Sequence, residues 1–140
     1  MSKRSHLDSE FDHLALIRMR TTTPSSRFAC YSYLEAVYRQ YRLWAEDGAA
    51  KRRSRILSRK HGVELRRGVH PVRVLITLTY PSIDPKMASR WTRALEYAAH
   101  CRALPGDLAG FFSRYGGVAG CAQMAARELP KRASDRDDWV

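Results

Sequence analysis

The sequence predicts a helix-dominated α+β fold, with four to five helices and one or two β-strands around residues 63–80. Two observations lead to this fold class. Apolar residues recur every three or four positions over 27–47 and again over 84–103, which is the period of an amphipathic helix. Between these stretches, "VRVLITLT" alternates with a period of two and is rich in β-branched residues, as strands are.

The length and composition of the sequence predict one domain with two flexible ends. Its 140 residues suit a single domain, and 44% hydrophobic residues are enough for a core. The domain is expected over 27–130. Residues 1–26 are expected to form a flexible N-terminal arm, because "TTTPSS" interrupts a short helical pattern, and 131–140 a flexible, charge-balanced tail.

The first helix of the domain is predicted over residues 27–47, with Gly48 at its end. Its aromatic residues could stack on bases, but their helical spacing favours a place in the core. The expected core face consists of Leu34, Val37, Tyr38, Tyr41, Trp44 and Ala45.

A second helix is predicted over 49–61 and closes at Gly62. At about 100° per residue, four of its cations share one arc of the helix. Ala49, Ile56 and Leu57 form a thin apolar seam on another arc. The cations of the first arc are Lys51, Arg52, Arg55 and Arg59.

The strand is predicted at "VRVLITLT", with Pro71 as a suitable first residue. Val72, Val74, Ile76 and Leu78 then face one side, and Arg73, Leu75, Thr77 and Thr79 face the other. The segment "VELRR" is expected as a shorter second strand, joined through "GVHP". Two arrangements remain open, a hairpin within one chain or a ribbon shared by two chains of a homodimer.

Three more helices are predicted toward the C-terminus. The first spans 84–103, with Asp84 as N-cap and Pro85 at the first helical position. The second, "LAGFFSRY", follows Asp107 and closes at a Gly-Gly pair, and the third, "VAGCAQMAARELP", ends at a proline. The expected core face of the 84–103 helix is Met87, Trp91, Ala94, Leu95, Ala98 and Cys101, and the opposite face is Lys86, Arg90, Arg93, Glu96, Tyr97 and His100.

Charge is the strongest functional signal. The formal net charge is +11, and residues 49–73 carry nine cations against one acid, Glu64. A solvated helix face usually mixes both signs, so this imbalance indicates polyanion binding, with DNA as the first expectation. The candidate nucleic-acid-binding residues are Lys51, Arg52, Arg53, Arg55, Arg59, Lys60, Arg66, Arg67, Arg73, Thr77 and Thr79.

Two DNA-binding layouts each match part of the sequence. The order strand, helix, helix from residue 72 onward resembles a ribbon-helix-helix unit, in which paired strands enter the major groove. Arg73, Thr77 and Thr79 would then read bases, although Leu75 on that face is apolar. The two short C-terminal helices instead suggest a helix-turn-helix, but the second offers only Gln123 and Arg127 as long polar side chains, which favours a structural role.

Other site types lack the residue spacing that they require. Zinc sites use close ligand pairs, and here only His100 and Cys101 are adjacent. Paired acids, an activated thiol and a phosphate-binding Gly-Lys loop are not evident either. We therefore expect no metal, no cofactor and no enzymatic activity.

Cysteine usage and hydropathy bear on the compartment. Three widely spaced cysteines argue against a disulfide framework and suit a reducing cytoplasm. No apolar run approaches the length of a membrane span, so no membrane partner is expected.

These patterns predict a small, non-enzymatic DNA-binding protein of the cytoplasm. Its expected role is that of a transcriptional regulator, or of an accessory protein of a replicon or mobile element. The alternative is a small basic interaction module or inhibitor, of phage or plasmid type, that docks an acidic protein. A third option is RNA binding, which would require Tyr31, Tyr33 and Tyr38 to be exposed for stacking.

Overall fold

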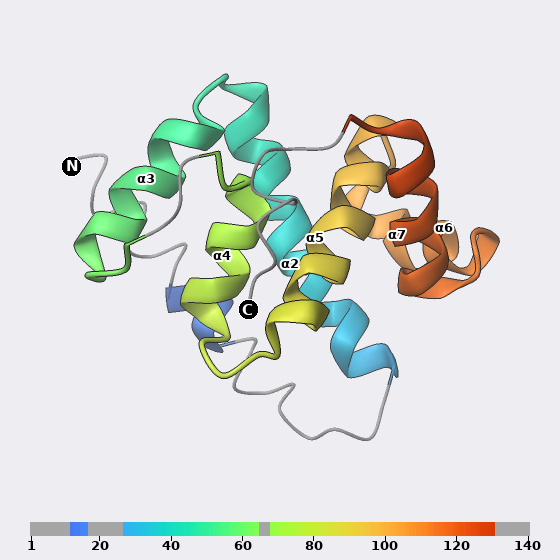
Figure 1. Cartoon of the computed structure of the whole chain (residues 1–140), viewed down its shortest axis with the longest axis horizontal. Coiled ribbons are helices and arrows are strands. Elements are labelled where there is room, and N and C mark those ends of the chain that lie inside the picture. The colour runs from blue at the N-terminus through green and yellow to red at the C-terminus, as the bar shows by residue number, and fades with distance from the viewer. Residues whose placement is uncertain (1–11, 17–26, 65–67, 131–140) are drawn as a thin grey trace.

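The structure, a computed structural model, describes residues 12–16, 27–64 and 68–130, and these residues contain helices but no β-strand. The predicted α+β class is therefore wrong, because the expected strand is a helix. The elements in chain order are α2 (Arg27–Glu46), α3 (Ala50–Lys60), α4 (Pro71–Thr79), α5 (Pro85–His100), the 3₁₀ turn η1 (Pro105–Asp107), α6 (Leu108–Arg114) and α7 (Gly117–Glu128) (Figure 1).

The expected arm and tail fall mostly outside the described residues. Residues 12–16 are helical, and within them Leu14 is buried in the hydrophobic core. Of the second expected strand, Val63 and Glu64 have no regular structure, and 65–67 lie outside the described part of the chain.

Helix α4 begins with a well-defined N-terminal cap. Pro71 occupies its first turn, and the Nδ1 atom of His70 accepts a hydrogen bond of 3.1 Å from the backbone N–H of Val72. Every residue from Pro71 to Ile76 is buried, and α2, α3 and α5 all pack against the helix. A helix that is apolar on all sides belongs in a core, and its sequence need not show a 3.6-residue period.

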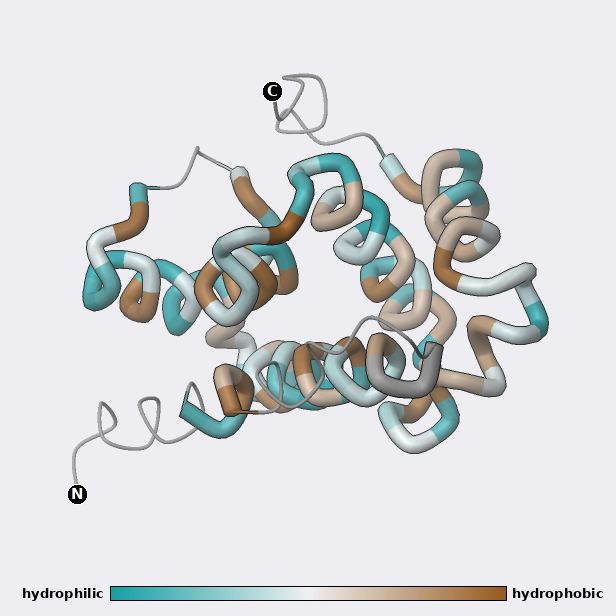
Figure 2. Tube along the Cα trace, turned by 90° about the horizontal axis from the view of Figure 1, so that it is seen from below, coloured by the Kyte–Doolittle hydropathy of each residue, from teal (hydrophilic) through white to brown (hydrophobic). Residues whose placement is uncertain are grey.

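The apolar face predicted for α2 is largely confirmed. Leu34, Val37, Tyr38 and Trp44 are fully buried. The hydroxyl of Tyr38 donates a 2.6 Å hydrogen bond to the carbonyl oxygen of Ala103, which ties α2 to the segment after α5. In Figure 2 the hydrophobic positions gather inside the bundle, whereas α3, at one end of the molecule, is mostly hydrophilic.

The remaining two positions of that face differ from the prediction. Tyr41 is only half-buried, and its ring lies 4.9 Å from the imidazole of His70. Ala45 is exposed, one residue before the end of α2.

Helix α5 is covered on two sides, whereas the sequence pattern predicted one buried face and one exposed face. It packs between α4 and α7. Its centre is buried as expected, but Glu96 and Tyr97, assigned to the outer face, are buried as well. Met87 and Cys101, assigned to the core, lie at the ends of the helix and are exposed.

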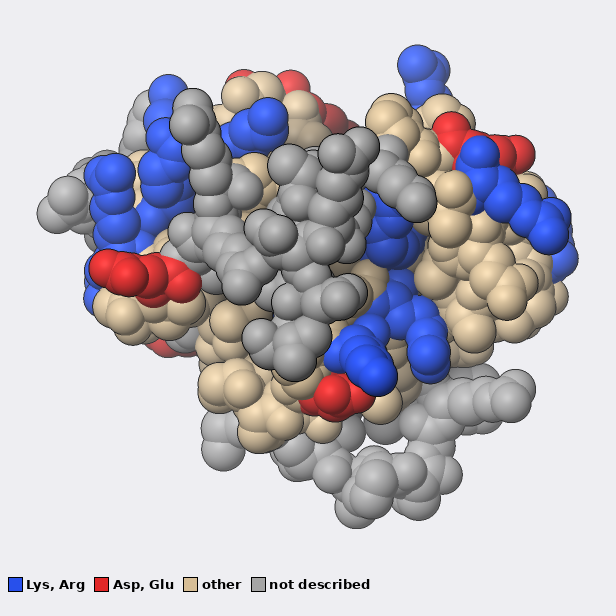
Figure 3. Space-filling model, viewed as in Figure 1, with Lys and Arg blue, Asp and Glu red and all other residues tan. Residues whose placement is uncertain are grey.

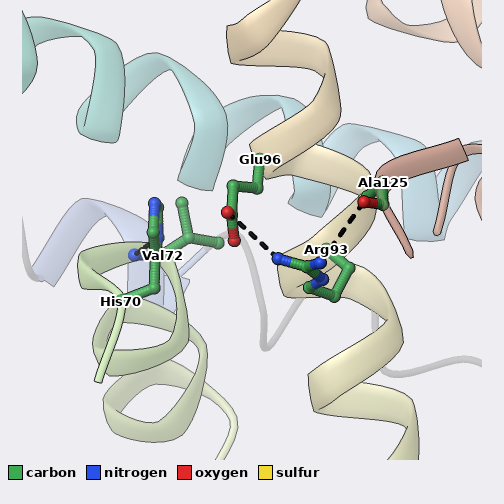
Figure 4. A network of polar contacts seen from close by, with 5 residues as sticks. All are labelled: His70, Val72, Arg93, Glu96 and Ala125. Carbon is green, nitrogen blue, oxygen red and sulfur yellow. Dashed lines mark hydrogen bonds and ion pairs between the residues drawn. The ribbon is translucent and has the colours of Figure 1, made fainter. Parts of the chain in front are cut away.

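A polar network links α5 to α7 inside the fold (Figure 4). The guanidinium of Arg93 contacts the Glu96 carboxylate at 3.1 Å, one turn along the same helix. Its other terminal nitrogen donates a 3.3 Å hydrogen bond to the carbonyl oxygen of Ala125. Only 14% and 11% of the Arg93 and Glu96 side chains are exposed, so Arg93 both neutralises a buried acid and holds the last turns of α7.

We expect Arg93→Met to lower the free energy of unfolding by about 2 kcal/mol. Removing one partner of a buried pair costs about 3–5 kcal/mol, and the partial exposure of Glu96 reduces that cost. Chemical denaturation measures the change. Arg127→Met, on the exposed side of α7, is the matched control and should change stability by less than about 0.5 kcal/mol. Equal losses in both variants would contradict the role of the network.

Candidate nucleic-acid interface

Helix α3 is built almost without counter-charge. Its eleven residues, "AKRRSRILSRK", contain six cations and no acid. Its first turn contains no acidic residue, and its N-cap residue, Ala49, makes no side-chain capping hydrogen bond. Nothing in the helix therefore offsets the positive end of its dipole. Lys51 and Arg52 lie at that end instead, so two cations share the first turn of α3 with backbone N–H groups that have no partner within a helix of this kind. Gly62, with φ of 67°, ends the segment as predicted.

The inner side of α3 is narrow and consists of two serines and a leucine. Ser54, Leu57 and Ser58 are buried against the rest of the fold. The Ser54 hydroxyl donates to the carbonyl oxygen of Lys51 at 2.9 Å, and the Ser58 hydroxyl donates to that of Val63 at 2.6 Å. Because both hydroxyls have backbone acceptors, α3 can lie close to α4 without burying a large apolar face.

The predicted basic arc is solvent-exposed. Lys51, Arg52, Arg55 and Arg59 are exposed, and none of them forms an ion pair with a described residue. We call these four residues the basic face of α3. In Figure 3, Lys and Arg side chains gather over α3 at the left end of the molecule, with acidic side chains below them.

Two further cations of α3 lie at the margins of this face. Lys60 is exposed. Arg53 is half-buried and contacts the carboxylate of Asp47 at 3.5 Å, so part of its charge is compensated.

Ile56 departs from the prediction. It was assigned to the apolar seam with Ala49 and Leu57, which are buried, but it is 37% exposed. At about 100° per residue, Ile56 lies closer to Arg52 than to the centre of the buried side formed by Ser54, Leu57 and Ser58. The two serines, which the sequence did not single out, define that side.

The three residues expected to read bases do not extend the basic face. Arg73 is only 7% exposed, and its Nη1 atom donates to the Ser89 hydroxyl at 2.7 Å and to the Pro85 carbonyl oxygen at 3.4 Å. Desolvation by burial lowers the pKa of the Arg73 guanidinium below its usual value.

The two threonines are also drawn into the fold. Thr79 is 3% exposed, and its hydroxyl donates to the Leu75 carbonyl oxygen at 2.7 Å and hydrogen-bonds with the Tyr33 hydroxyl. Thr77 is half-buried. Since α4 is a buried helix, these side chains form no exposed surface that could read bases. The other two predicted residues, Arg66 and Arg67, lie outside the described residues.

The cysteine thiols and the possible metal ligands of the described residues were the other candidates for chemistry. Burial raises the pKa of the Cys30 and Cys121 thiols to about 11, which disfavours the reactive thiolate. Cys101, expected to be buried, is exposed at the end of α5. Within residues 12–16, 27–64 and 68–130, no three His, Cys, Asp or Glu side chains are grouped so that they could hold a metal ion. None of the described helices is both long and apolar enough to cross a membrane.

The tyrosines proposed for base stacking serve the core. Tyr33 and Tyr38 are buried at 2% and 0% exposure. The ring of Tyr31 is half-buried and packs 5.4 Å from that of Phe112. These rings therefore do not offer the open faces that single-strand binding requires.

Comparison of the chain with models of protein families, with curated proteins and with solved structures finds no match.

Proposed function

We propose that the protein binds duplex DNA, and that the basic face of α3 makes the phosphate contacts. The observation that carries the proposal is the exposure of Lys51, Arg52, Arg55 and Arg59 on one side of a helix that has no acid. Cations of this density neutralise phosphates and release the counterions that surround them, which supplies most of the affinity in sequence-independent DNA binding.

The arrangement carries an electrostatic cost that a bound polyanion would remove. Like charges on neighbouring turns repel, and Lys51 and Arg52 also lie at the positive end of the helix dipole. A helix face with only a solvation role ordinarily mixes signs, as α2 does where Arg39 and Glu35 pair at 3.5 Å. A phosphate backbone at α3 would satisfy both the side chains and the N-terminal dipole.

Duplex DNA is favoured over single-stranded nucleic acid because of where the aromatic rings lie. Tyr33 and Tyr38 are buried and Tyr31 packs on Phe112, so they cannot serve as stacking platforms. The raised pKa of the Cys30 and Cys121 thiols disfavours a thiolate nucleophile at either position. Such a protein would act as a regulator, or as an accessory protein of a replicon or mobile element.

A salt titration tests the proposal. Fluorescence anisotropy with a labelled duplex should give binding that weakens steeply with salt, with a slope of log K against log salt of about −3 to −4 for four phosphate contacts. Single-stranded DNA and RNA of equal length should bind more weakly. Absence of binding at low salt, or binding that ignores salt, would refute the proposal. A stoichiometric complex with an acidic protein that survives nuclease treatment would favour the alternative partner.

A further inference from the structure

The most outward line of α3 is a ridge formed by Arg52, Ile56 and Arg59. Their spacing of four and then three residues places them within about 60° of each other on the helix surface. All three are exposed, and Ile56 is one of the few large apolar side chains on the surface of the described residues, at 37% exposure. Folding does not account for it, because Leu57, Ser54 and Ser58 already fill the seam against the protein.

Cations flank this ridge on both sides. Lys51 and Arg55 lie along one side and Lys60 along the other, so the charged arc covers about 180° of the helix. A helix that rests on a single DNA strand needs cations along one side only. Two charged sides with a ridge between them match a groove, where phosphates stand on both walls and base edges form the floor.

The dimensions of α3 fit that arrangement. An α-helix with its side chains is about 10–12 Å wide, and the major groove of B-DNA is about 12 Å wide. Helix α3 lies at one end of the molecule (Figure 1). Its buried residues, Ser54, Leu57 and Ser58, form the narrow side that contacts the fold. Helices α6 and α7 lie toward the other end of the molecule and so would stay clear of a duplex bound at α3.

We propose that α3 is a recognition helix that enters the major groove, where Arg52 and Arg59 each read a guanine and Ile56 contacts a thymine methyl group between them. This inference rests on the proposed function and adds sequence readout to it. Arginine donates two hydrogen bonds to O6 and N7 of guanine, and apolar side chains contact the thymine methyl. The proposal thus assigns base recognition to α3 and no longer to Arg73, Thr77 and Thr79.

The spacing of the ridge sets the expected site. Arg52 and Arg59 are seven residues apart, which is about 10 Å along the helix axis. Base pairs rise by about 3.4 Å each, so the two guanines should lie about three base pairs apart. The charged part of α3, from Lys51 to Lys60, covers about four base pairs.

Selection from a pool of randomised duplexes, using the full chain, tests the inference. We expect enriched sites with two guanines about three base pairs apart and thymine between them. Arg52→Lys and Arg59→Lys keep the charge but lose the planar fork, so each should lower the preference for one guanine by about tenfold. Affinity for unrelated duplexes and the salt slope should stay unchanged. Ile56→Ala should weaken the preference for thymine alone.

Arg55→Lys is the matched control, because it changes the same residue type on the flank and should leave every base preference in place. A pool without enrichment, together with salt-sensitive binding, would overturn the reading role and leave the phosphate-binding function standing. Enrichment that survives both Arg52→Lys and Arg59→Lys would also overturn it. If no duplex binds at low salt, the proposed function fails, and the reading role fails with it.

Discussion

Replacing Lys51, Arg55 and Arg59 together with glutamine should lower the affinity for duplex DNA of unrelated sequence, where Arg59 has no guanine to read and contacts phosphate, by about two orders of magnitude at about 0.1 M salt. The three side chains are exposed and form no ion pair with described residues, so their positive charge is available to phosphates. Each lost contact should also reduce the slope of log K against log salt by about 0.9. Anisotropy titrations of both proteins over a salt series measure the two quantities.

A second triple variant separates contact from overall charge. Lys86, Arg90 and Arg114 are exposed on α5 and α6, away from α3, and their replacement by glutamine removes the same three charges. Long-range attraction alone should lower affinity by less than about tenfold, because a Debye length of about 10 Å screens distant charges at this salt concentration. Equal losses in the two variants would show that net charge, rather than the basic face of α3, decides binding.

Helices with one solvent-exposed face were predictable from the sequence. The 27–47 and 49–61 patterns correspond to α2 and α3, because each has polar residues on the side that faces water. Pro85 begins α5 as expected, although the Asp84 side chain forms no capping hydrogen bond. The two C-terminal helices also match, with Gly116 between them and Gly117 as the first residue of α7.

Helix α4 was not predictable from periodicity, because burial on every side removes the contrast between faces. In a nine-residue apolar segment, alternation of two residues and a helical period are hard to tell apart, and β-branched residues are a weak preference that packing overrides. The better signal was His70 followed by Pro71. Proline is favoured in the first helical turn, and His70 caps the helix through Nδ1.

For the candidate site, too, solvent exposure was predicted correctly on the amphipathic helix α3 and wrongly on the buried helix α4. The exposure of Lys51 and Arg55 followed from local helical geometry, which the structure bears out. The predicted exposure of Arg73 and Thr79 depended on a two-residue period. It was wrong because the segment is a helix surrounded by α2, α3 and α5, and both residues are buried. Which side of a buried element faces water is decided by its neighbours, and a single sequence does not identify them.

The corner between α6 and α7 depends on an unusually close backbone approach. Gly116 and Gly117 have φ of 85° and 83°, which favours glycine. At Gly120, a Cβ atom would lie 1.7 Å from the carbonyl oxygen of Tyr115. Tyr115 has little room to move, because its ring packs 5.5 Å from that of Tyr97 and 4.9 Å from that of Phe111. The "YGGVAG" segment is thus explained by packing, as a C-terminal cap and a close helix contact.

Gly120→Ala should therefore lower the free energy of unfolding by about 3 kcal/mol or more, because the added methyl group must displace a backbone carbonyl. Gly110→Ala provides the opposite control. Gly110 lies inside α6, and nothing is within 4 Å of its Cβ position, so alanine should raise stability by about 0.4–1 kcal/mol. Denaturant unfolding of both variants measures the difference. If Gly120→Ala were as stable as the parent chain, the contact between Tyr115 and Gly120 would not exist in solution, and the angle between α6 and α7 would have to differ.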